Sequence, residues 1–82
     1  MYYVYLLKSV KTHKLYVGST PDLRRRFIQH NAGKNLSTKS GVPWQLLYYE
    51  AFPAKHLALE RERKLKRYGR GMVALKERLG LR

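Results

Sequence analysis

The sequence predicts a small α+β domain in which helices flank a three-stranded antiparallel sheet. Apolar and aromatic residues fill residues 2–8, alternate with polar ones at 15–20, and recur at 44–52. Segments of this length and pattern are typical of strands. Helix-start signals follow the second and third segments. We therefore expect the order strand, strand, helix, strand, helix, helix.

The chain is short and contains no cysteine. Its 82 residues predict a single domain spanning residues 1–82. The lack of cysteine excludes a disulfide partner and cysteine-ligated metal. No apolar run is long enough to cross a membrane, and the first residues lack the layout of a signal peptide. We therefore expect a cytoplasmic protein with no membrane partner.

The charge is strongly positive, with 18 Lys plus Arg against 5 Asp plus Glu and a net charge of +13. A protein with such an excess attracts polyanions, because each neutralised phosphate of a nucleic acid releases condensed counterions. DNA is the expected partner, and RNA is the other nucleic acid that this charge fits. The alternatives from charge alone are a ribosome-associated protein or simple solubility.

The first two strands are expected to form a hairpin rich in tyrosine. If its turn is centred on residues 10–11, Tyr5 faces Tyr16 and Tyr3 faces Gly18. Gly18 would then leave a gap beside the tyrosines on one face of the sheet. A one-residue slip would put Tyr5 and Tyr16 on opposite faces. Aromatic cross-strand pairs also stabilise ordinary sheets, so the hairpin by itself is more typical of a core than of a catalytic site.

A helix-start signal occupies residues 20–33. Thr20 is expected to cap the helix, Pro21 to take its first position, and Asp22 to lie at the positive end of its dipole. Gly33 is expected to end it.

Four charged or titratable side chains of this helix fall on different sides. Arg26 and His30 are four residues apart and border the apolar stripe, whereas Arg24 and Arg25 point toward solvent or phosphate. Taken alone, Arg26 is also consistent with a side chain that covers the core, and His30 with a hydrogen-bonded histidine at its edge.

Two further helices are expected after the third strand. Pro53 begins one that runs to about Tyr68, Gly69 and Gly71 interrupt the pattern, and residues 72–79 form the last. Glu62 stands at the rim of the apolar face of the first of these helices. A salt bridge to Lys66, four residues later, is the alternative explanation for Glu62.

At this point an ordered set of residues resembles the GIY-YIG nuclease family. Tyr3-Val4-Tyr5 matches its first triplet and Tyr16-Val17-Gly18 its second, and Arg26, His30 and Glu62 fall where the family carries an arginine, a histidine and a glutamate. The set spans nearly the whole chain and is most similar to the small stand-alone bacterial members.

The resemblance implies an endonuclease that hydrolyses phosphodiester bonds in DNA with one Mg²⁺ or Mn²⁺ ion. Selectivity for particular DNA structures is compatible with this expectation. Glu62 would hold the ion and Arg26 would brace the scissile phosphate. Tyr5 would be the general base, with His30 as its hydrogen-bond partner or proton acceptor, and Tyr16 would position water or phosphate. The roles of the two tyrosines are exchangeable. Arg26 and the ion would have to lower the pKa of the basic tyrosine from its usual value of about 10.

Exposed basic residues would hold the nucleic acid, and Trp44 would either stack on an unpaired base or lie in the core. Tyr3, Gly18 and Thr20 would support the site structurally. Ser19 departs from relatives that carry a lysine there, and this favours a second hypothesis, a nucleic-acid-binding module without catalysis. The expected nucleic-acid contacts are Arg24, Arg25, Lys34, Lys39, Arg63, Lys64, Arg67 and Arg70.

Overall fold

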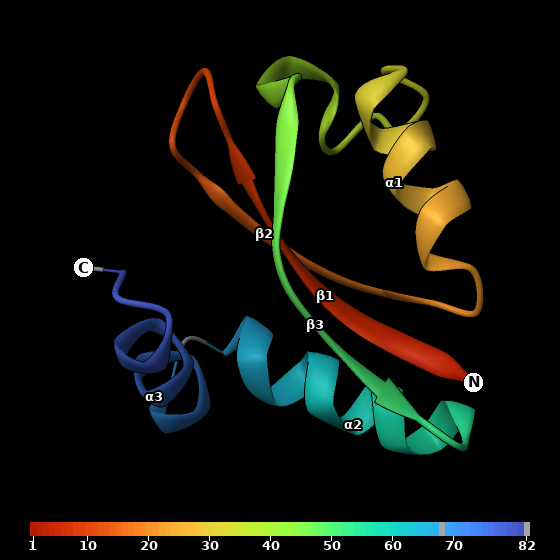
Figure 1. Ribbon diagram of the computed structural model, residues 1–82, viewed down its shortest axis with the longest axis vertical. Helices are drawn as coiled ribbons and strands as arrows, with labels where there is room; N and C mark the ends of the chain where they lie inside the picture. The colour runs from red at the N-terminus through yellow and green to blue at the C-terminus, as the bar shows by residue number, and fades with distance from the viewer. Residues whose placement is uncertain (68, 82) are drawn as a thin grey trace.

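The computed structural model of the protein describes residues 1–67 and 69–81. Within them the predicted class and order of elements are confirmed (Figure 1). The elements are β1 (Tyr2–Ser9), β2 (Leu15–Thr20), α1 (Leu23–Asn31), the short 3-10 helix η1 (Lys39–Gly41), β3 (Trp44–Phe52), α2 (Lys55–Lys66) and α3 (Arg70–Arg78).

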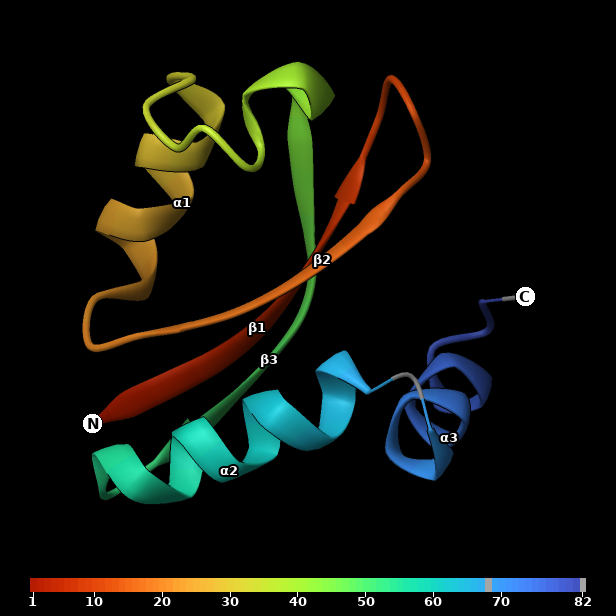
Figure 2. The ribbon, with the colours of Figure 1, turned by 180° about the vertical axis from the view of Figure 1, so that it is seen from behind.

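The three strands form one antiparallel sheet with the order β2-β1-β3. The central position of β1 explains its apolar run, because Val4, Tyr5, Leu6 and Leu7 are all buried. Helix α1 covers one face of the sheet, and α2 and α3 cover the other (Figures 1 and 2). Because β1 lies between β2 and β3, these two are the edge strands.

Alternation along the strands divides the core into two clusters, one on each face. The cluster on the α2 and α3 side comprises Val4, Leu6, Val17, Ala58, Leu65, Met72 and Leu75. The cluster on the α1 side comprises Tyr5, Leu7 and Trp44, with Tyr16, Leu23, Phe27 and Val42 packed against it.

The hairpin register differs by two residues from the expected one. Tyr5 pairs with Gly18 and not with Tyr16, which lies opposite Leu7. The turn reaches further along the chain, because the Ser9 N–H donates to the Lys14 carbonyl at 2.9 Å. A shift of two residues keeps every side chain on its face, so Tyr5 and Tyr16 still share one.

The start of α1 lies later than expected. Thr20 is the last residue of β2, and its hydroxyl accepts from the Asp22 N–H at 3.1 Å. Asp22 is the cap, since its carboxylate accepts from the Arg25 N–H at 3.1 Å. Thr20 therefore does not cap the helix, and Pro21 precedes it. Gly33 follows the helix with a φ of 73°, in the left-handed region that favours glycine.

The bounds of the last two helices also differ from those expected. Helix α2 begins at Lys55, two residues after Pro53, and its expected end at Tyr68 lies outside the described residues. Helix α3 begins at Arg70 and includes Gly71, so this glycine does not interrupt it.

A salt bridge joins β3 to α2. Arg61 donates to both carboxylate oxygens of Glu50, at 2.9 and 3.0 Å, and the Tyr48 hydroxyl donates to the same carboxylate at 2.6 Å. Burial alone would raise the pKa of Glu50, but hydrogen bonds from Arg61 and Tyr48 lower it below its usual range.

Candidate active site

Two tyrosines and a histidine gather on the α1 face of the sheet. The Tyr5 hydroxyl lies 2.8 Å from His30 Nε2. The Tyr16 ring lies edge-on to the His30 ring, with centroids 5.1 Å apart, and 6.3 Å from the Tyr5 ring. Tyr5 is 3% exposed and His30 fully buried, whereas Tyr16 is partly exposed. The structure thus brings together three of the five predicted catalytic residues, and Tyr16 is the one that faces solvent.

A hydrogen-bond chain continues from His30 into the loop after α1. His30 Nδ1 lies 2.7 Å from the hydroxyl of Thr38, a residue that is also fully buried. The Thr38 hydroxyl donates its own proton to the Asn35 carbonyl at 3.4 Å. It therefore accepts from His30 Nδ1, which leaves Nε2 to accept from Tyr5.

Burial controls the protonation of this chain. It raises the pKa of Tyr5 well above its usual value, the nearby Tyr16 raises it further, and the opposing effect of Arg26 is smaller. The expectation that Arg26 lowers the pKa of Tyr5 below its usual value is therefore wrong for the protein alone. Burial, and secondly Arg26, lower the pKa of His30 below 6.5. Tyr5 is accordingly a neutral donor and His30 a neutral acceptor near pH 7.

Gly18 is needed because the Tyr5 ring lies directly across it. A Cβ at this position would lie 2.5 Å from Tyr5 Cζ and would also overlap the hydroxyl oxygen. The expected gap beside the tyrosines is thus filled by Tyr5 itself. Gly18 fixes where the Tyr5 ring lies and does not leave an opening for a phosphate.

Trp44 belongs to the core and does not offer a stacking surface. It is 7% exposed, and its Nε1–H donates to the Thr38 carbonyl at 2.8 Å. The Asn31 side chain accepts from the Trp44 N–H at 2.6 Å and donates to the Trp44 carbonyl at 3.1 Å. These bonds tie the end of α1 to β3 and hold Thr38 against His30.

Glu62 reaches the site from the other face of the sheet. The Ser19 hydroxyl donates to Glu62 Oε1 at 2.5 Å, and Lys66 Nζ lies 2.7 Å from Oε2. The salt bridge that offered the alternative explanation for Glu62 is therefore present. The Glu62 charge also raises the pKa of Tyr5, as the smallest of the four contributions to it. In Figure 2, β2 is the strand nearest the viewer, with α1 above it and α2 below.

Arg26 lies on the side of α1 that faces this edge and is partly exposed. Its charge lowers the pKa of both Tyr5 and His30, which places it near the hydrogen-bonded pair. Arg26 and Gln29 line two adjoining hollows, one toward Pro21 and the other toward Lys34. Together the hollows form a groove that runs along α1 past Arg26.

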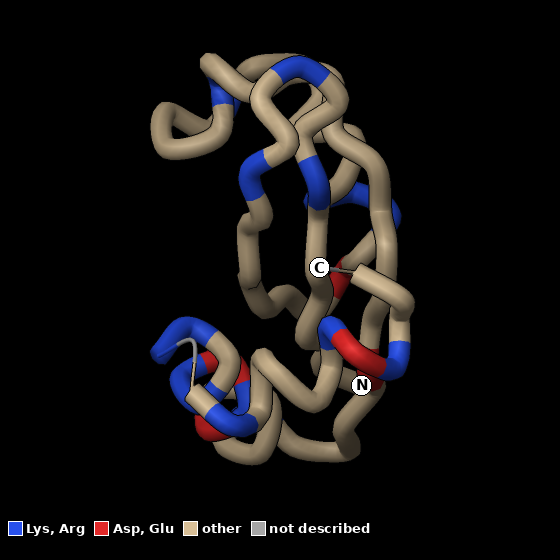
Figure 3. The backbone as a smooth tube through the Cα atoms, turned by 90° about the vertical axis from the view of Figure 1, so that its left-hand side faces the viewer, with Lys and Arg blue, Asp and Glu red and all other residues tan. Residues whose placement is uncertain are grey.

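All of the predicted nucleic-acid contacts are exposed, and they lie on α1, α2, α3 and η1, in the loop after α1, and at Arg67 directly after α2. Figure 3 shows Lys and Arg at both ends of the view, with acidic residues among the lower group. The exposed set is Arg24, Arg25, Lys34, Lys39, Arg63, Lys64, Arg67 and Arg70.

The sequence did not single out two polar partners of the site. Thr38 lies in a loop without periodic pattern, so nothing in its position signalled a contact with His30. Ser19 was noted only as a departure from a lysine. Strand alternation turns Ser19 away from Tyr16 and Gly18 and toward α2, which is the signal that could have paired it with Glu62.

The carboxylate of Glu62 fits a hard divalent cation. In residues 1–67 and 69–81 no three His, Asp or Glu side chains form a metal-binding group. A single carboxylate is compatible with Mg²⁺, which keeps several waters and takes phosphate oxygens as ligands. The same residues contain no helix that is long and apolar enough to cross a membrane.

Comparison with known proteins yields one family. The GIY-YIG catalytic domain matches residues 1–72. A UPF0213 protein of Haloquadratum walsbyi is 39% identical over 70 residues, which are 84% of this chain and 78% of that one. A UPF0213 protein of Streptococcus pyogenes serotype M3 is 47% identical over 62 residues, which are 73% of this chain and 65% of the streptococcal one.

A solved structure supports the same grouping. The chain is similar to the solution NMR structure of the UPF0213 protein BH0048 from Bacillus halodurans, with a TM-score of 0.54 and 34% identity. The similarity covers 93% of this chain and 86% of the other.

Proposed function

Because the chain belongs to the GIY-YIG family, we propose that it is an endonuclease that hydrolyses phosphodiester bonds in DNA with Mg²⁺ or Mn²⁺. The observation that carries this proposal is the gathering of Tyr5, Tyr16 and His30 beside Arg26, with Glu62 held by Ser19 on the other side of strand β2. A module that only binds a polyanion has no evident need for a carboxylate that the Ser19 hydroxyl holds beside strand β2.

Arg26 is the phosphate clamp. Its guanidinium is partly exposed in the groove along α1, and its planar fork matches two phosphate oxygens. In this position the positive charge of Arg26 would stabilise the negative charge that develops on the phosphoryl oxygens in the transition state.

Tyr16 meets the attacking water, because it is the tyrosine of the pair that solvent reaches. Buried Tyr5 supports it through their tilted ring contact and through the edge-on contact that each tyrosine makes with His30. The chain from Tyr5 through His30 to Thr38 fixes the Tyr5 and His30 rings. This assignment exchanges the two tyrosine roles that the resemblance first suggested.

Glu62 is the metal ligand, and Ser19 orients it by donating to Oε1. When bound, the ion would polarise the phosphoryl oxygen and ease departure of the leaving alkoxide. Lys66 would have to release Glu62 Oε2, a small rearrangement because the Lys66 side chain is 52% exposed. The protein then works in the cytoplasm on DNA held by its exposed basic residues.

One observation favours the second hypothesis, a nucleic-acid-binding module that keeps the nuclease fold. The ammonium of Lys66 lies 2.7 Å from Glu62, on the oxygen that a metal ion would take. A protein of this kind would bind DNA or RNA in a salt-sensitive way without cutting it.

A cleavage screen separates the two hypotheses. Branched, flapped, single-stranded and duplex DNA, with RNA copies, are incubated with the protein in Mg²⁺, in Mn²⁺ and in chelator. The nuclease predicts nicks in at least one DNA that chelator and Glu62→Ala both abolish, while binding to that DNA persists. Salt-sensitive binding with no product on any substrate would contradict the proposed activity.

A further inference from the structure

A further hollow, separate from the groove along α1, lies between the start of α1 and strand β3. It encloses about 570 Å³, a volume within the usual range of small-ligand pockets. Its wall is mostly apolar and aromatic, and one cation and one carboxylate stand at its rim. The wall comprises Tyr3, Leu23, Phe27, Leu46 and Tyr49, and the rim residues are Arg24 and Asp22.

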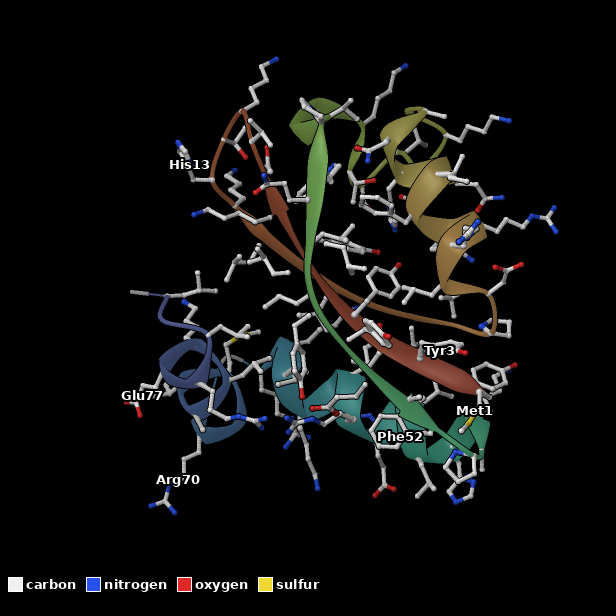
Figure 4. The ribbon with its side chains drawn as sticks, viewed as in Figure 1. Met1, Tyr3, His13, Phe52, Arg70 and Glu77 are labelled. Atoms are coloured by element: carbon white, nitrogen blue, oxygen red, sulfur yellow. The ribbon has the colours of Figure 1, made fainter. Side chains whose placement is uncertain are left out.

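The strands place the aromatic wall directly beside the hydrogen-bonded tyrosine. Tyr49 of β3 is the cross-strand partner of Tyr5, so both point to the α1 face. Tyr3 lies diagonally across from Tyr49, with ring centroids 6.1 Å apart and planes at 64°. Tyr49 is 53% exposed although it lies on the face of the sheet that α1 covers. Figure 4 shows Tyr3 near the start of β1, close to the turn that leads into α1.

The hollow adjoins the groove that carries Arg26. Pro21 and Asp22, at the turn before α1, line both of them. A strand whose phosphate lies at Arg26 could therefore continue around the start of α1 and reach Tyr49.

We propose that this hollow binds an unpaired nucleobase of the strand whose phosphate lies at Arg26. The inference rests on the proposed function and names the form of nucleic acid that the site prefers. The base stacks on the exposed Tyr49 ring, as sequence-tolerant single-strand sites do. Arg24 binds the adjoining phosphate, and the Asp22 carboxylate accepts from an amino group of the base. The net charge of +13 favours this polyanion over a protein segment as the occupant.

The test measures binding without turnover, in chelator and at fixed salt. The probes are two fluorescein-labelled DNA duplexes of equal paired length, one blunt and one with a three-nucleotide single-stranded overhang. The wild type binds the overhang duplex more tightly. Tyr49→Ala loses about tenfold in affinity for the overhang duplex and keeps its affinity for the blunt one. Tyr49→Phe keeps both, because stacking needs the ring and not the hydroxyl.

Val73→Ala is the matched control, since Val73 is 54% exposed on α3, away from the hollow, and should bind both duplexes like the wild type. Backbone amide NMR shifts of the wild-type protein supply a readout that needs no variant. The overhang duplex should shift Tyr3, Arg24 and Tyr49 more than the blunt duplex does.

Equal affinity of the wild type for the two duplexes overturns the proposal, as does an overhang preference that survives Tyr49→Ala. A change from dimer to monomer in Tyr49→Ala, with DNA affinity intact, would show that a second copy occupies the hollow and also overturns it. Overhang preference lost in Tyr49→Ala, in a protein that cuts nothing, sustains the base pocket and refutes the nuclease. If the protein cuts DNA and Tyr49→Ala leaves the overhang preference unchanged, the nuclease is sustained and the base pocket is refuted.

Discussion

The Tyr5 hydroxyl and His30 Nε2 lie 2.8 Å apart, and the residues that carry them are 25 positions apart in the chain. The other ring nitrogen of His30, Nδ1, lies 2.7 Å from the Thr38 hydroxyl. Both ends of this chain lie in the protein interior, where an unmatched polar group costs about 1–3 kcal/mol. Tyr5, His30 and Thr38 therefore form one unit that must be kept or lost together.

The first prediction concerns pH. The pKa of His30 is lowered in the folded protein, so below about pH 7 the unfolded chain binds a proton at this residue more tightly than the folded chain does. The contribution of this group to stability is complete above its usual pKa of 6.5 and declines as the pH falls below that value toward the lowered pKa. The free energy of unfolding, measured by denaturant titration, should therefore fall between pH 7.5 and pH 5.

His30→Gln should show a shallower decline over that range, because the titrating group is gone. His56→Gln is the matched control, since His56 is exposed on α2, and it should keep the slope of the wild type. Should the nitrogen shifts of His30 show a protonated ring in folded protein at pH 7, the assignment of its neutral form is wrong.

The second prediction concerns Gly18. A methyl group there overlaps the Tyr5 ring, so Gly18→Ala must push that ring away from His30. Overpacking of this kind costs about 1–3 kcal/mol, and the cleavage rate should fall with it. Denaturant unfolding measures the first effect and single-turnover cleavage the second. Gly69→Ala is the control, because a Cβ at Gly69 meets nothing within 4 Å. Equal losses in the two variants would contradict the role given to the Tyr5 ring.

The third prediction concerns Ser19. Its hydroxyl donates to Glu62 Oε1 at 2.5 Å, so Ser19→Ala frees the carboxylate to turn toward Lys66. Loss of a group that orients a metal ligand typically costs about 10–100-fold in metal affinity or activity. The Mg²⁺ concentration for half-maximal cleavage should rise, while DNA affinity in chelator stays the same. Ser37→Ala, at an exposed loop serine, should leave both unchanged.

Much of the fold could be predicted from local pattern. The strands at 15–20 and 44–52 have the expected bounds, because alternation and aromatic runs report burial directly. The hairpin register was missed because it depends on the turn, where Ser9 accepts from Thr12 and His13 has a φ of 64°. The cap of α1 was missed because Thr20 and Asp22 are both good cap residues, and the end of β2 decides between them.

The resemblance led us to expect that Tyr5 and His30 lie together, whereas the pKa that burial gives Tyr5 was not expected. The pairing of Tyr5 with His30 followed from the resemblance. The pKa of Tyr5 was expected to fall because nearby charge can be guessed from sequence, whereas burial is decided by packing. The contact of Ser19 with Glu62 joins residues 43 positions apart, and strand alternation signals only that Ser19 faces α2, not which residue of α2 it meets.

The most direct test of the proposed function compares two glutamates on the same helix. Glu62 touches Ser19 and acts on Tyr5, whereas Glu60 is exposed. The measurement is the single-turnover cleavage rate of Glu62→Gln and Glu60→Gln with Mg²⁺, on the best substrate of the screen, with binding measured in chelator. We predict that Glu62→Gln loses cleavage and keeps binding, and that Glu60→Gln keeps both. Cleavage by Glu62→Gln at the wild-type rate would contradict the assignment of Glu62 as the metal ligand.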